Sequence, residues 1–435
     1  VLPHPHRACL RTWICGSLRP LPPFNRLMLQ LRWHCSQSLS NQVFNIQPKL
    51  RRGTPSLKRN KSSQQLPQTP LLRTNYRKMA TDASPIVTKV VDVRNKSDEV
   101  FDEAVSLIQA GELVAFPTET VYGLGANALD ASATKKIFLA KNRPNDNPLI
   151  VHVSDRSMLD SLVSSVPEDA QKLMDEFWPG ALTLLLPKKS VVPEEVTCGQ
   201  PTVAIRMPSH PIAHKLIHLS QRPIAAPSAN LSGRPSPTTA QHVLTDLQGR
   251  LHCILDGGSC DVGLESTVVD VNRSPPLILR PGGITLEMLR KVLPNIQLYS
   301  KETAGVDLEE KPPTPGLKYR HYSPTASLIL YEGKLSDVRD RLAEDTAKYK
   351  AEGKKVGFIH TRTALELPEV LKSLPIIHLG DEQHPLQVAQ GLFAALRAFD
   401  EQLVDVILME GISEENEGLA VMNRARKAAS GVVQV

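Results

Sequence analysis

The chain has 435 residues, of which 41% are hydrophobic and 22% are charged, a composition typical of a soluble globular protein with about three domains. No apolar run approaches the roughly 18 residues that a membrane helix needs, which argues against an integral membrane protein. The six cysteines form no CxxC pair, so a zinc module and a disulfide scaffold are also disfavoured, and an intracellular protein with reduced thiols is favoured.

The net charge of +6 combines two unlike parts of the chain. Residues 1–81 contain 14 Lys and Arg and no Asp or Glu, so the remainder holds 37 basic against 45 acidic residues. A basic isoelectric point often indicates nucleic-acid binding, but here the basic excess lies entirely in the first 81 residues. The body of the protein is mildly acidic.

The basic leader, residues 1–81, is rich in scattered Arg and in Ser and lacks acids, as organelle transit peptides do. A disordered basic tail, or sequence upstream of the true start, fits the same composition. Met28 and Met79 are both plausible initiators. We expect a cytoplasmic protein and, if the leader is a transit peptide, a mitochondrial form as well.

Residues 87–298 alternate strand and helix patterns, which predicts a large α/β domain built on one twisted sheet. The predicted strands cover 87–93, 113–117, 148–153, 181–187, 202–208, 223–228, 253–258, 266–271 and 277–282. The predicted helices cover 97–111, 131–141, 156–164, 167–177, 210–219, 238–247 and 285–293.

A Pro-rich segment, residues 299–325, separates this domain from a second α/β pattern over 326–435. Prolines 312, 313 and 315 disfavour helix, and the adjoining KYRHY cluster suits a lid as well as a linker. The second pattern predicts a small Rossmann-like domain whose last strand is 404–411. It contains no G-x-G-x-x-G, so no dinucleotide site is expected.

Two cations, Lys141 and Arg143, stand two residues apart in a segment expected to be extended and without nearby acids. Such a pair suits a polyphosphate, because Arg can donate two parallel hydrogen bonds and Lys supplies a compact charge. A solvated basic turn is nevertheless the commoner interpretation of such a pair. Arg206 lies inside an apolar strand and needs an anion, either an internal carboxylate or a substrate. His152 lies in another apolar strand, where a core histidine is the default interpretation.

Small hydroxyl and amide side chains follow several predicted strands, in segments 226–238, 263–270 and 279–283. Loops of this kind bind phosphates and small polar substrates. In segment 117–130, Gly123 and Gly125 would let the backbone approach a ligand in a strand-to-helix turn. No nucleophile motif is present, so the pattern indicates an enzyme that positions a nucleoside triphosphate and a small anionic substrate.

These motifs together resemble the threonylcarbamoyl-AMP synthases, the two-domain form of the YrdC family, over about residues 87–435. The resemblance rests on PTETVYGLGANA, WPGALTLLL, VAIRMPSHP, APSANLSGRPSPT, GLESTVVD, LRPGG and GLKYRHYSP in that order, with GLAVMNRARKAAS near the end. It implies a YrdC-like catalytic domain, and a nucleotidyltransferase reaction of L-threonine, bicarbonate and ATP that gives L-threonylcarbamoyladenylate and pyrophosphate. A separate downstream transferase complex would then modify tRNA.

The resemblance also implies which residues form the site. Its Lys-x-Arg and Ser-x-Asn signature gives the catalytic group Lys141, Arg143, Ser228 and Asn230. The implied threonine pocket is Thr120, His152, Arg206, the backbone at Ala226, and Ser266. The implied ATP side is Arg143, Asn147, Thr202, Ser228, Ser236 and Arg280, with Tyr319 and His321 on the lid. No protein-bound metal is expected beyond Mg²⁺ carried with ATP.

Two other interpretations stay open on the sequence. One is a nucleic-acid-binding module, because YrdC-type domains present a basic concave face; weak binding of tRNA or double-stranded RNA belongs here. The acidic body and the 4% aromatic content disfavour it. The other is a hydrogenase-maturation carbamoyltransferase that consumes carbamoyl phosphate, disfavoured because its Cys-rich zinc fingers are missing from this sequence.

Overall fold

The computed structural model describes residues 86–435, except 305–307, 309–311, 317–320, 362–366 and 382. The chain divides into two compact units, Val1–Lys78 and Met79–Val435, and all elements described below belong to the second. None of the helices in the described part of the chain is long and apolar enough to cross a membrane.

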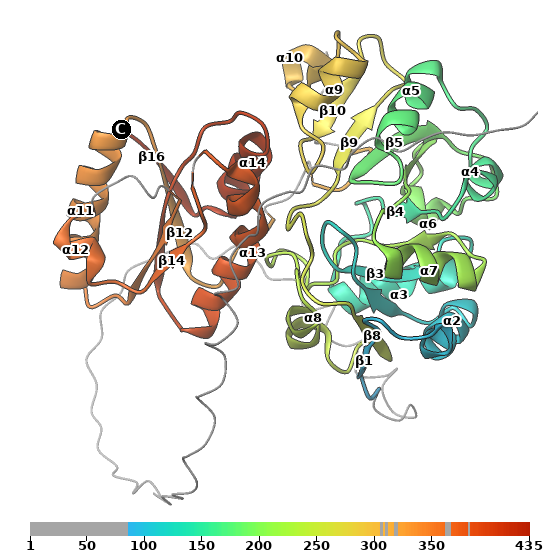
Figure 1. Ribbon diagram of the computed structural model, residues 1–435, viewed down its shortest axis with the longest axis horizontal. Coiled ribbons are helices and arrows are strands. Elements are labelled where there is room, and N and C mark those ends of the chain that lie inside the picture. Colours follow the sequence, from blue (N-terminus) through green and yellow to red (C-terminus); the bar gives the residue numbers. More distant parts are fainter. Residues whose placement is uncertain (1–85, 305–307, 309–311, 317–320, 362–366, 382) are drawn as a thin grey trace, which may run out of the picture. The chain divides into compact units, whose positions relative to one another are not determined.

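An eleven-stranded mixed sheet forms the larger part of the fold (Figure 1). Its strand order is β1-β8-β2-β3-β7-β4-β6-β5-β9-β10-β11. The strands are β1 (Lys89–Asp92), β2 (Val114–Phe116), β3 (Gly123–Asn127), β4 (Ile150–His152), β5 (Leu182–Pro187), β6 (Thr202–Arg206), β7 (Ile224–Ala225), β8 (Cys253–Asp256), β9 (Thr267–Asp270), β10 (Leu277–Arg280) and β11 (Gln297–Leu298). The predicted α/β class and large sheet are confirmed.

The seven predicted helices are present, the first of them divided into η2 and α2, and the structure adds the short helices α6 and α10. The helices are the short 3-10 turn η2 (Asp98–Phe101), α2 (Asp102–Gln109), α3 (Ala131–Lys141), α4 (Arg156–Leu162), α5 (Glu168–Phe177), α6 (Glu194–Thr197), α7 (Pro211–Ser220), α8 (Ala240–Leu247), α9 (Leu286–Val292) and α10 (Lys301–Ala304). One apolar cluster packs residues of α3, α5 and α8 against the sheet, and another packs α2 and α7 against it. The sheet is therefore covered on two faces.

Segment 117–130 differs from the predicted strand-to-helix turn. It turns back as β3, which pairs antiparallel with both β2 and β7. A Cβ on Gly125 would lie 2.7 Å from both Ile224 Cγ2 and Phe116 Cε1. Gly125 is thus required by side-chain packing within the sheet and does not serve the approach of a ligand.

A separate five-stranded sheet, with order β14-β13-β15-β12-β16, forms the C-terminal domain. Its strands, all parallel, are β12 (Ser327–Glu332), β13 (Val356–His360), β14 (Ile376–His378), β15 (Val406–Glu410) and β16 (Gly431–Gln434). Helices α11 (Leu335–Ala351) and α12 (Glu369–Lys372) lie on one side, and α13 (Pro385–Glu401) and α14 (Gly418–Ala428) on the other (Figure 1). The expected Rossmann-like layering is present.

The prediction that 404–411 is the last strand is wrong, because β16 adds to the edge beside β12. The sequence GVVQV is too short and too exposed to stand out as a strand: only alternate residues of β16 are even partly buried. It is held by backbone pairing with β12.

Candidate active site

A cavity of about 70 Å³ lies against the central strands of the larger sheet. Residues from nine separate stretches of chain line it: Thr118, Thr120, Val121, Gly123, Arg143, Ile150, His152, Arg206, Ala226, Pro227, Ser228, Glu265, Ser266, Arg280, Pro315, Gly316, His321 and Tyr322. All five residues expected around threonine are among them.

Arg206 ends β6 and is buried at 3% exposure. Its Nη1 donates to Thr120 Oγ1 (2.8 Å) and its Nε donates to the Gly180 carbonyl (3.1 Å). Its Nη2 lies 2.7 Å from Glu119 Oε1 but makes no well-aligned hydrogen bond. The sequence left open whether this arginine meets an internal carboxylate or a substrate; here Glu119 supplies the countercharge, and Nη2 still has an N–H to donate.

His152 lies beside Arg206 in the parallel register of β4 and β6. Its ring is buried, and its Nδ1 has no hydrogen-bond partner. Burial and then the charge of Arg206 lower the pKa of His152 from 6.5 to about 3, so the ring is neutral at neutral pH. Burial raises the pKa of the neighbouring Glu119, but Arg206 more than offsets this and the net pKa is lowered. A buried polar atom without a partner on a cavity wall marks a place for a polar ligand.

Lys141 and Arg143, the phosphate-binding pair predicted from the sequence, were expected in an extended segment, but Lys141 is helical. Lys141 is the last residue of α3, because Asn142 takes the left-handed conformation (φ 52°) that ends the helix. Arg143 follows the turn, lines the cavity, and donates to the carbonyls of Asn147 (3.1 Å) and Pro148 (3.1 Å). Burial lowers the pKa of Arg143 to about 10, and it lowers that of Lys141 well below the ordinary value.

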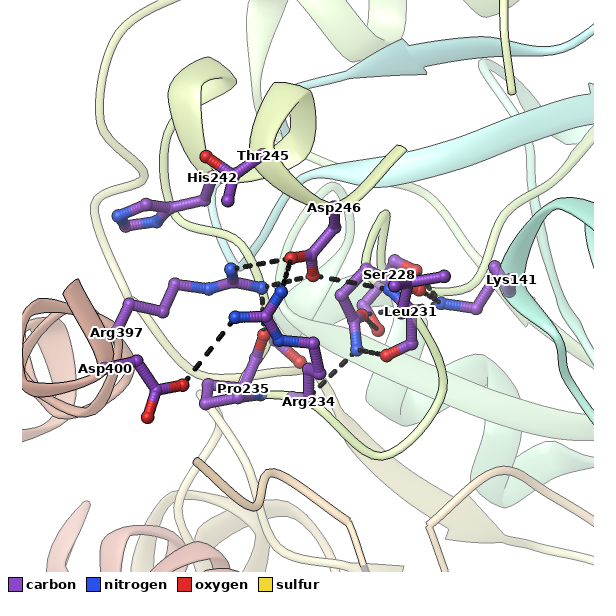
Figure 2. A network of polar contacts seen from close by, with 12 residues as sticks. Lys141, Ser228, Leu231, Arg234, Pro235, His242, Thr245, Asp246, Arg397 and Asp400 are labelled. Atoms are coloured by element: carbon purple, nitrogen blue, oxygen red, sulfur yellow. Dashed lines mark hydrogen bonds and ion pairs between the residues drawn. The ribbon is translucent and has the colours of Figure 1, made fainter. Parts of the chain in front are cut away.

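Lys141 does not line the cavity but lies beneath the 228–236 loop (Figure 2). Its Nζ donates to the carbonyls of Ser228 and Asn230 (2.6 Å to the latter). Ser228 Oγ donates to Asn230 Oδ1 (2.6 Å), and Asn230 Nδ2 donates to the carbonyls of Leu231 and Arg234. The Lys-x-Arg and Ser-x-Asn residues are therefore brought together, with Arg143 and Ser228 at the cavity wall.

Ser266 and Arg280 form a second polar group on the wall. Arg280 ends β10 and donates through Nη2 to Ser266 Oγ (3.1 Å) and to the Ser266 carbonyl (2.9 Å). Ser266 Oγ also contacts Thr183 Oγ1 at 2.8 Å. Burial lowers the pKa of Arg280 from its ordinary value.

The Pro-rich segment contributes Pro315, Gly316, His321 and Tyr322 to the cavity wall. Tyr322 is buried, and its ring stacks on Phe393 of α13 at 5.2 Å between centroids. Burial and then the charge of Arg143 lower the pKa of His321 to about 3. Tyr319 lies outside the described residues.

Three expected ATP-side residues are absent from the cavity wall in the described structure. Asn147 is buried behind Arg143, with its Oδ1 unpartnered. Ser236 is buried and its Oγ donates to Glu265 Oε1 at 2.5 Å. Thr202 begins β6, at the opposite end of that strand from Arg206.

Sequence reasoning missed several residues of the site. Glu119 stands within the quoted PTET motif, but nothing in the sequence showed that it faces Arg206, which lies 87 positions later in the chain. Glu265 likewise stands within GLESTVVD and contacts Arg424 of α14. Burial raises the pKa of Glu265, but the charges of Arg424 and Arg280 lower it by more. The pKa of Glu265 is therefore below its ordinary value.

The arrangement offers cationic and hydroxyl donors around a water-poor space. The described residues contain no group of three or more His, Cys, Asp or Glu that could hold a metal ion. Such a site can bind anions and polarise them, but it presents no activated nucleophile of its own. The reacting groups must therefore come from the substrates.

Two known protein families match adjacent stretches of the chain. Residues 106–282 match a family described as telomere recombination, which covers the YrdC-type proteins. Residues 284–430 match the C-terminal domain of threonylcarbamoyl-AMP synthase.

Curated relatives match this chain over most of their own lengths. A threonylcarbamoyl-AMP synthase of Pyrococcus abyssi is 50% identical over 79% of this chain and 98% of that protein. One of Bacillus subtilis is 48% identical over 79% and 97%, and one of Schizosaccharomyces pombe is 44% identical over 74% and 86%. The solved structure of P. abyssi Sua5 complexed with L-threonine superposes with a TM-score of 0.74 at 48% identity, covering 80% of this chain and all of that one.

Proposed function

Because the chain belongs to the threonylcarbamoyl-AMP synthase family and is a transferase of that activity, we propose that its cavity combines L-threonine, bicarbonate and ATP. The products would be L-threonylcarbamoyladenylate and pyrophosphate. The observation that carries this is a pair of buried polar atoms on the wall of the described structure: His152 Nδ1 has no hydrogen-bond partner, and Arg206 Nη2 forms no aligned hydrogen bond beside its ion pair with Glu119.

L-Threonine fits the end of the cavity around Arg206. The unpartnered N–H of Arg206 is suited to the substrate carboxylate, since charge-assisted bonds from guanidinium to carboxylate are the stronger kind. The hydroxyls of Thr120 and Ser266 and the backbone at Ala226 suit the amine and hydroxyl of threonine. A neutral His152 adds no second positive charge beside Arg206, which suits a threonine amine that reacts as the nucleophile.

ATP fits the wall residues Arg143, Ser228 and Arg280, the last of which also donates to Ser266. Arg143 and Arg280 would face the triphosphate, with Ser228 and Ser236 as hydroxyl donors. Asn147, Thr202, Tyr319 and His321 remain part of this proposed ATP site. Lys141 fixes the carbonyls of Ser228 and Asn230 and so sets the shape of the loop on which the phosphates would rest.

The reaction needs two bond-forming steps, and each balances with the named substrates. The threonine amine attacks bicarbonate, which gives the N-carboxylate and water. One oxygen of that carboxylate then attacks the α-phosphorus of ATP, the bond to the β-phosphate breaks, and pyrophosphate leaves. Arg143 and Arg280 would stabilise the charge on the phosphates as the leaving group departs.

Mg²⁺ would enter as part of the substrate MgATP. The described residues supply no protein-only metal site, and Mg²⁺ in nucleotide enzymes is held largely by phosphate oxygens and water.

The cavity must enlarge before ATP can enter. At about 70 Å³ it is well below the roughly 300–1,000 Å³ of pockets that bury drug-sized ligands. Pro315, Gly316, His321 and Tyr322 are the wall residues that the Pro-rich segment between the two sheets contributes, and this segment is the proposed lid. Closing it over ATP would keep water from the carbamoyl-adenylate.

The product would pass to a separate transferase complex that modifies tRNA; any contact with tRNA or double-stranded RNA by this chain would be weak. We propose that the protein acts in the cytoplasm and that the acid-free leader directs a longer form to mitochondria.

The test is mass spectrometry of the products made by purified chain from threonine, bicarbonate and MgATP, without tRNA. Arg143→Ala should lower adenylate formation by at least about 100-fold with the fold intact, because a charge that faces the phosphates is removed. Arg143→Lys should recover part of the rate, since it keeps the charge and loses the fork.

Arg222→Ala serves as the matched control, because Arg222 is exposed and bonds only the adjacent Gln221 carbonyl among the described contacts. Its rate should stay within twofold of the unmodified chain. No adenylate from the unmodified chain would refute the proposed activity, and a near-normal rate in Arg143→Ala would refute the phosphate assignment.

A further inference from the structure

A buried network of charges links α13 of the C-terminal domain to the 228–236 loop (Figure 2). Its centre is Asp246 on α8, whose side chain is 0% exposed. Asp246 accepts from Arg397 Nη2 (2.8 Å) and Nη1 (3.2 Å), and it lies 2.6 Å from Arg234 Nη1. It also accepts from the backbone N–H of Leu231 (3.3 Å).

Arg397 contacts the loop directly as well as through Asp246. It is 3% exposed, and its Nη2 donates to the Pro235 carbonyl at 2.5 Å. One turn further along α13, Asp400 lies 3.6 Å from Arg234 Nη2 and accepts from the backbone N–H of Thr325 (2.8 Å). Two acids thus face two arginines, so the network is neutral as a whole.

The loop that these contacts hold is the one that carries the proposed ATP-side serines. Asn230 Nδ2 donates to the carbonyls of Leu231 and Arg234, the residues that the network holds, and its Oδ1 accepts from Ser228 Oγ. A continuous set of contacts therefore runs from Arg397 to Ser228 at the cavity wall. None of the proposed threonine residues lies in this loop.

The far end of the loop is held from the C-terminal domain by an independent contact. Arg424 of α14 is fully buried, donates from Nε to Glu265 Oε2 (2.8 Å) and from Nη1 to the Pro281 carbonyl (2.7 Å). Glu265 Oε1 in turn accepts from Ser236 Oγ at 2.5 Å. Arginines of the C-terminal domain thus hold the loop directly at Pro235, through Glu265 at Ser236, and through Asp246 at Leu231.

Buried ion pairs of this kind contribute little net stability compared with apolar packing, because both charges lose their hydration. Their directional bonds nevertheless fix geometry, and the geometry fixed here is that of a ligand-binding loop. Removing one partner would leave Asp246 buried with only Arg234 and one backbone N–H.

We propose that Arg397 is a positioning residue through which the C-terminal domain shapes the ATP side of the site. The threonine side is formed without Arg397. This rests on the proposed function, in which Ser228 and Ser236 belong to the ATP side. Arg397 itself does not line the cavity.

The experiment measures binding of L-threonine and of a non-hydrolysable MgATP analogue to the full chain by calorimetry. Arg397→Gln should raise the Kd of the ATP analogue at least 10-fold and leave the Kd of threonine within twofold. Arg397→Lys keeps the charge but cannot bond Asp246 and the Pro235 carbonyl as a fork, so about a threefold increase is expected for the analogue alone.

Arg341→Gln is the matched control. It also removes an arginine–aspartate contact of the C-terminal domain, Arg341 Nε to Asp345 Oδ2 at 2.9 Å, but on α11. Both Kd values should stay unchanged in it.

Each outcome decides the matter. The inference would be overturned if Arg397→Gln bound the ATP analogue with the Kd of the unmodified chain. It would also be overturned if the Kd values of threonine and of the analogue rose by the same factor. Should Arg397→Gln not fold, Arg397→Lys is judged by the same selective weakening. Failure of the unmodified chain to bind threonine or the analogue would instead overturn the proposed function.

Discussion

At the scale of single residues, the site depends on buried polar atoms that find no partner within the described protein. Such atoms are rare in folded proteins because each costs free energy when it is removed from water. His152 Nδ1 on the cavity wall is one of them, and the neighbouring Arg206 Nη2 forms no aligned hydrogen bond beside its ion pair with Glu119. Their concentration there is explained if a polar substrate completes their hydrogen bonds.

The neutral buried state of His152 predicts how stability depends on pH. The unfolded chain protonates this histidine near pH 6.5, whereas the folded chain does so only near pH 3. Between these values the unfolded state binds the extra proton, so the free energy of unfolding falls as the pH falls, by up to about 1.4 kcal/mol per pH unit. Above pH 6.5 His152 makes no such contribution.

His152→Gln should therefore flatten the fall in unfolding free energy between pH 6 and 4 by up to about 1.4 kcal/mol per pH unit. Denaturant titrations at several pH values measure it. His252→Gln, the same substitution at a half-exposed histidine outside the cavity, is the control. An unaltered slope in His152→Gln would show that the His152 ring is not kept neutral by burial.

At the scale of elements, the lid segment is held against the cavity by a backbone turn at Gly316. Its φ of 97° suits glycine, and a Cβ there would lie 3.0 Å from Arg280 Cδ. Lys427 of α14 donates to the Gly316 carbonyl, so this turn also contacts the C-terminal domain. Under the proposed function, this turn of the lid segment would control access to the ATP side.

Gly316→Ala should weaken lid closure, because the added methyl group strains the backbone by about 1–3 kcal/mol and crowds Arg280. We expect kcat/KM for MgATP to fall about 10-fold while the Kd of threonine stays within twofold. Gly353→Ala is the control, since Gly353 also has a positive φ (73°) but nothing within 4 Å of the added Cβ. Equal kinetics in the two variants would contradict a lid function for this turn.

At the scale of the whole molecule, the positive charge and the catalytic fold belong to different parts of the chain. The cavity and both sheets belong to the unit Met79–Val435, and the basic excess lies in residues 1–81. The overall charge therefore says little about the reaction.

Removal of residues 1–78 should leave adenylate formation within twofold of the full chain, as measured by product mass spectrometry. A reporter fused to residues 28–90 should locate to mitochondria if the leader is a transit peptide. A strictly cytosolic reporter would reject the mitochondrial part of the proposal, and loss of activity on deletion would show that the leader contributes to the enzyme.

The amino-acid sequence by itself determined the class of fold, most of the elements and the family. Periodic apolar runs fixed the strands and helices within a few residues, because burial of one face or stripe is a local property of the chain. The sequence-based prediction missed β3 and β16, because the local pattern of each is weak. The glycines of β3 resemble a turn, and β16 depends on pairing with β12.

Only the tertiary structure decided which charges meet. Arg206 needed an anion on any interpretation, but its partner Glu119 lies 87 residues earlier and is defined by the meeting of β6 with the loop after β2. The contact of Arg397 with Asp246 spans 151 positions. Sequence patterns report periodic burial along one element, whereas a buried ion pair depends on where two distant elements come to lie, so the support of the site by the C-terminal domain became visible only in the fold.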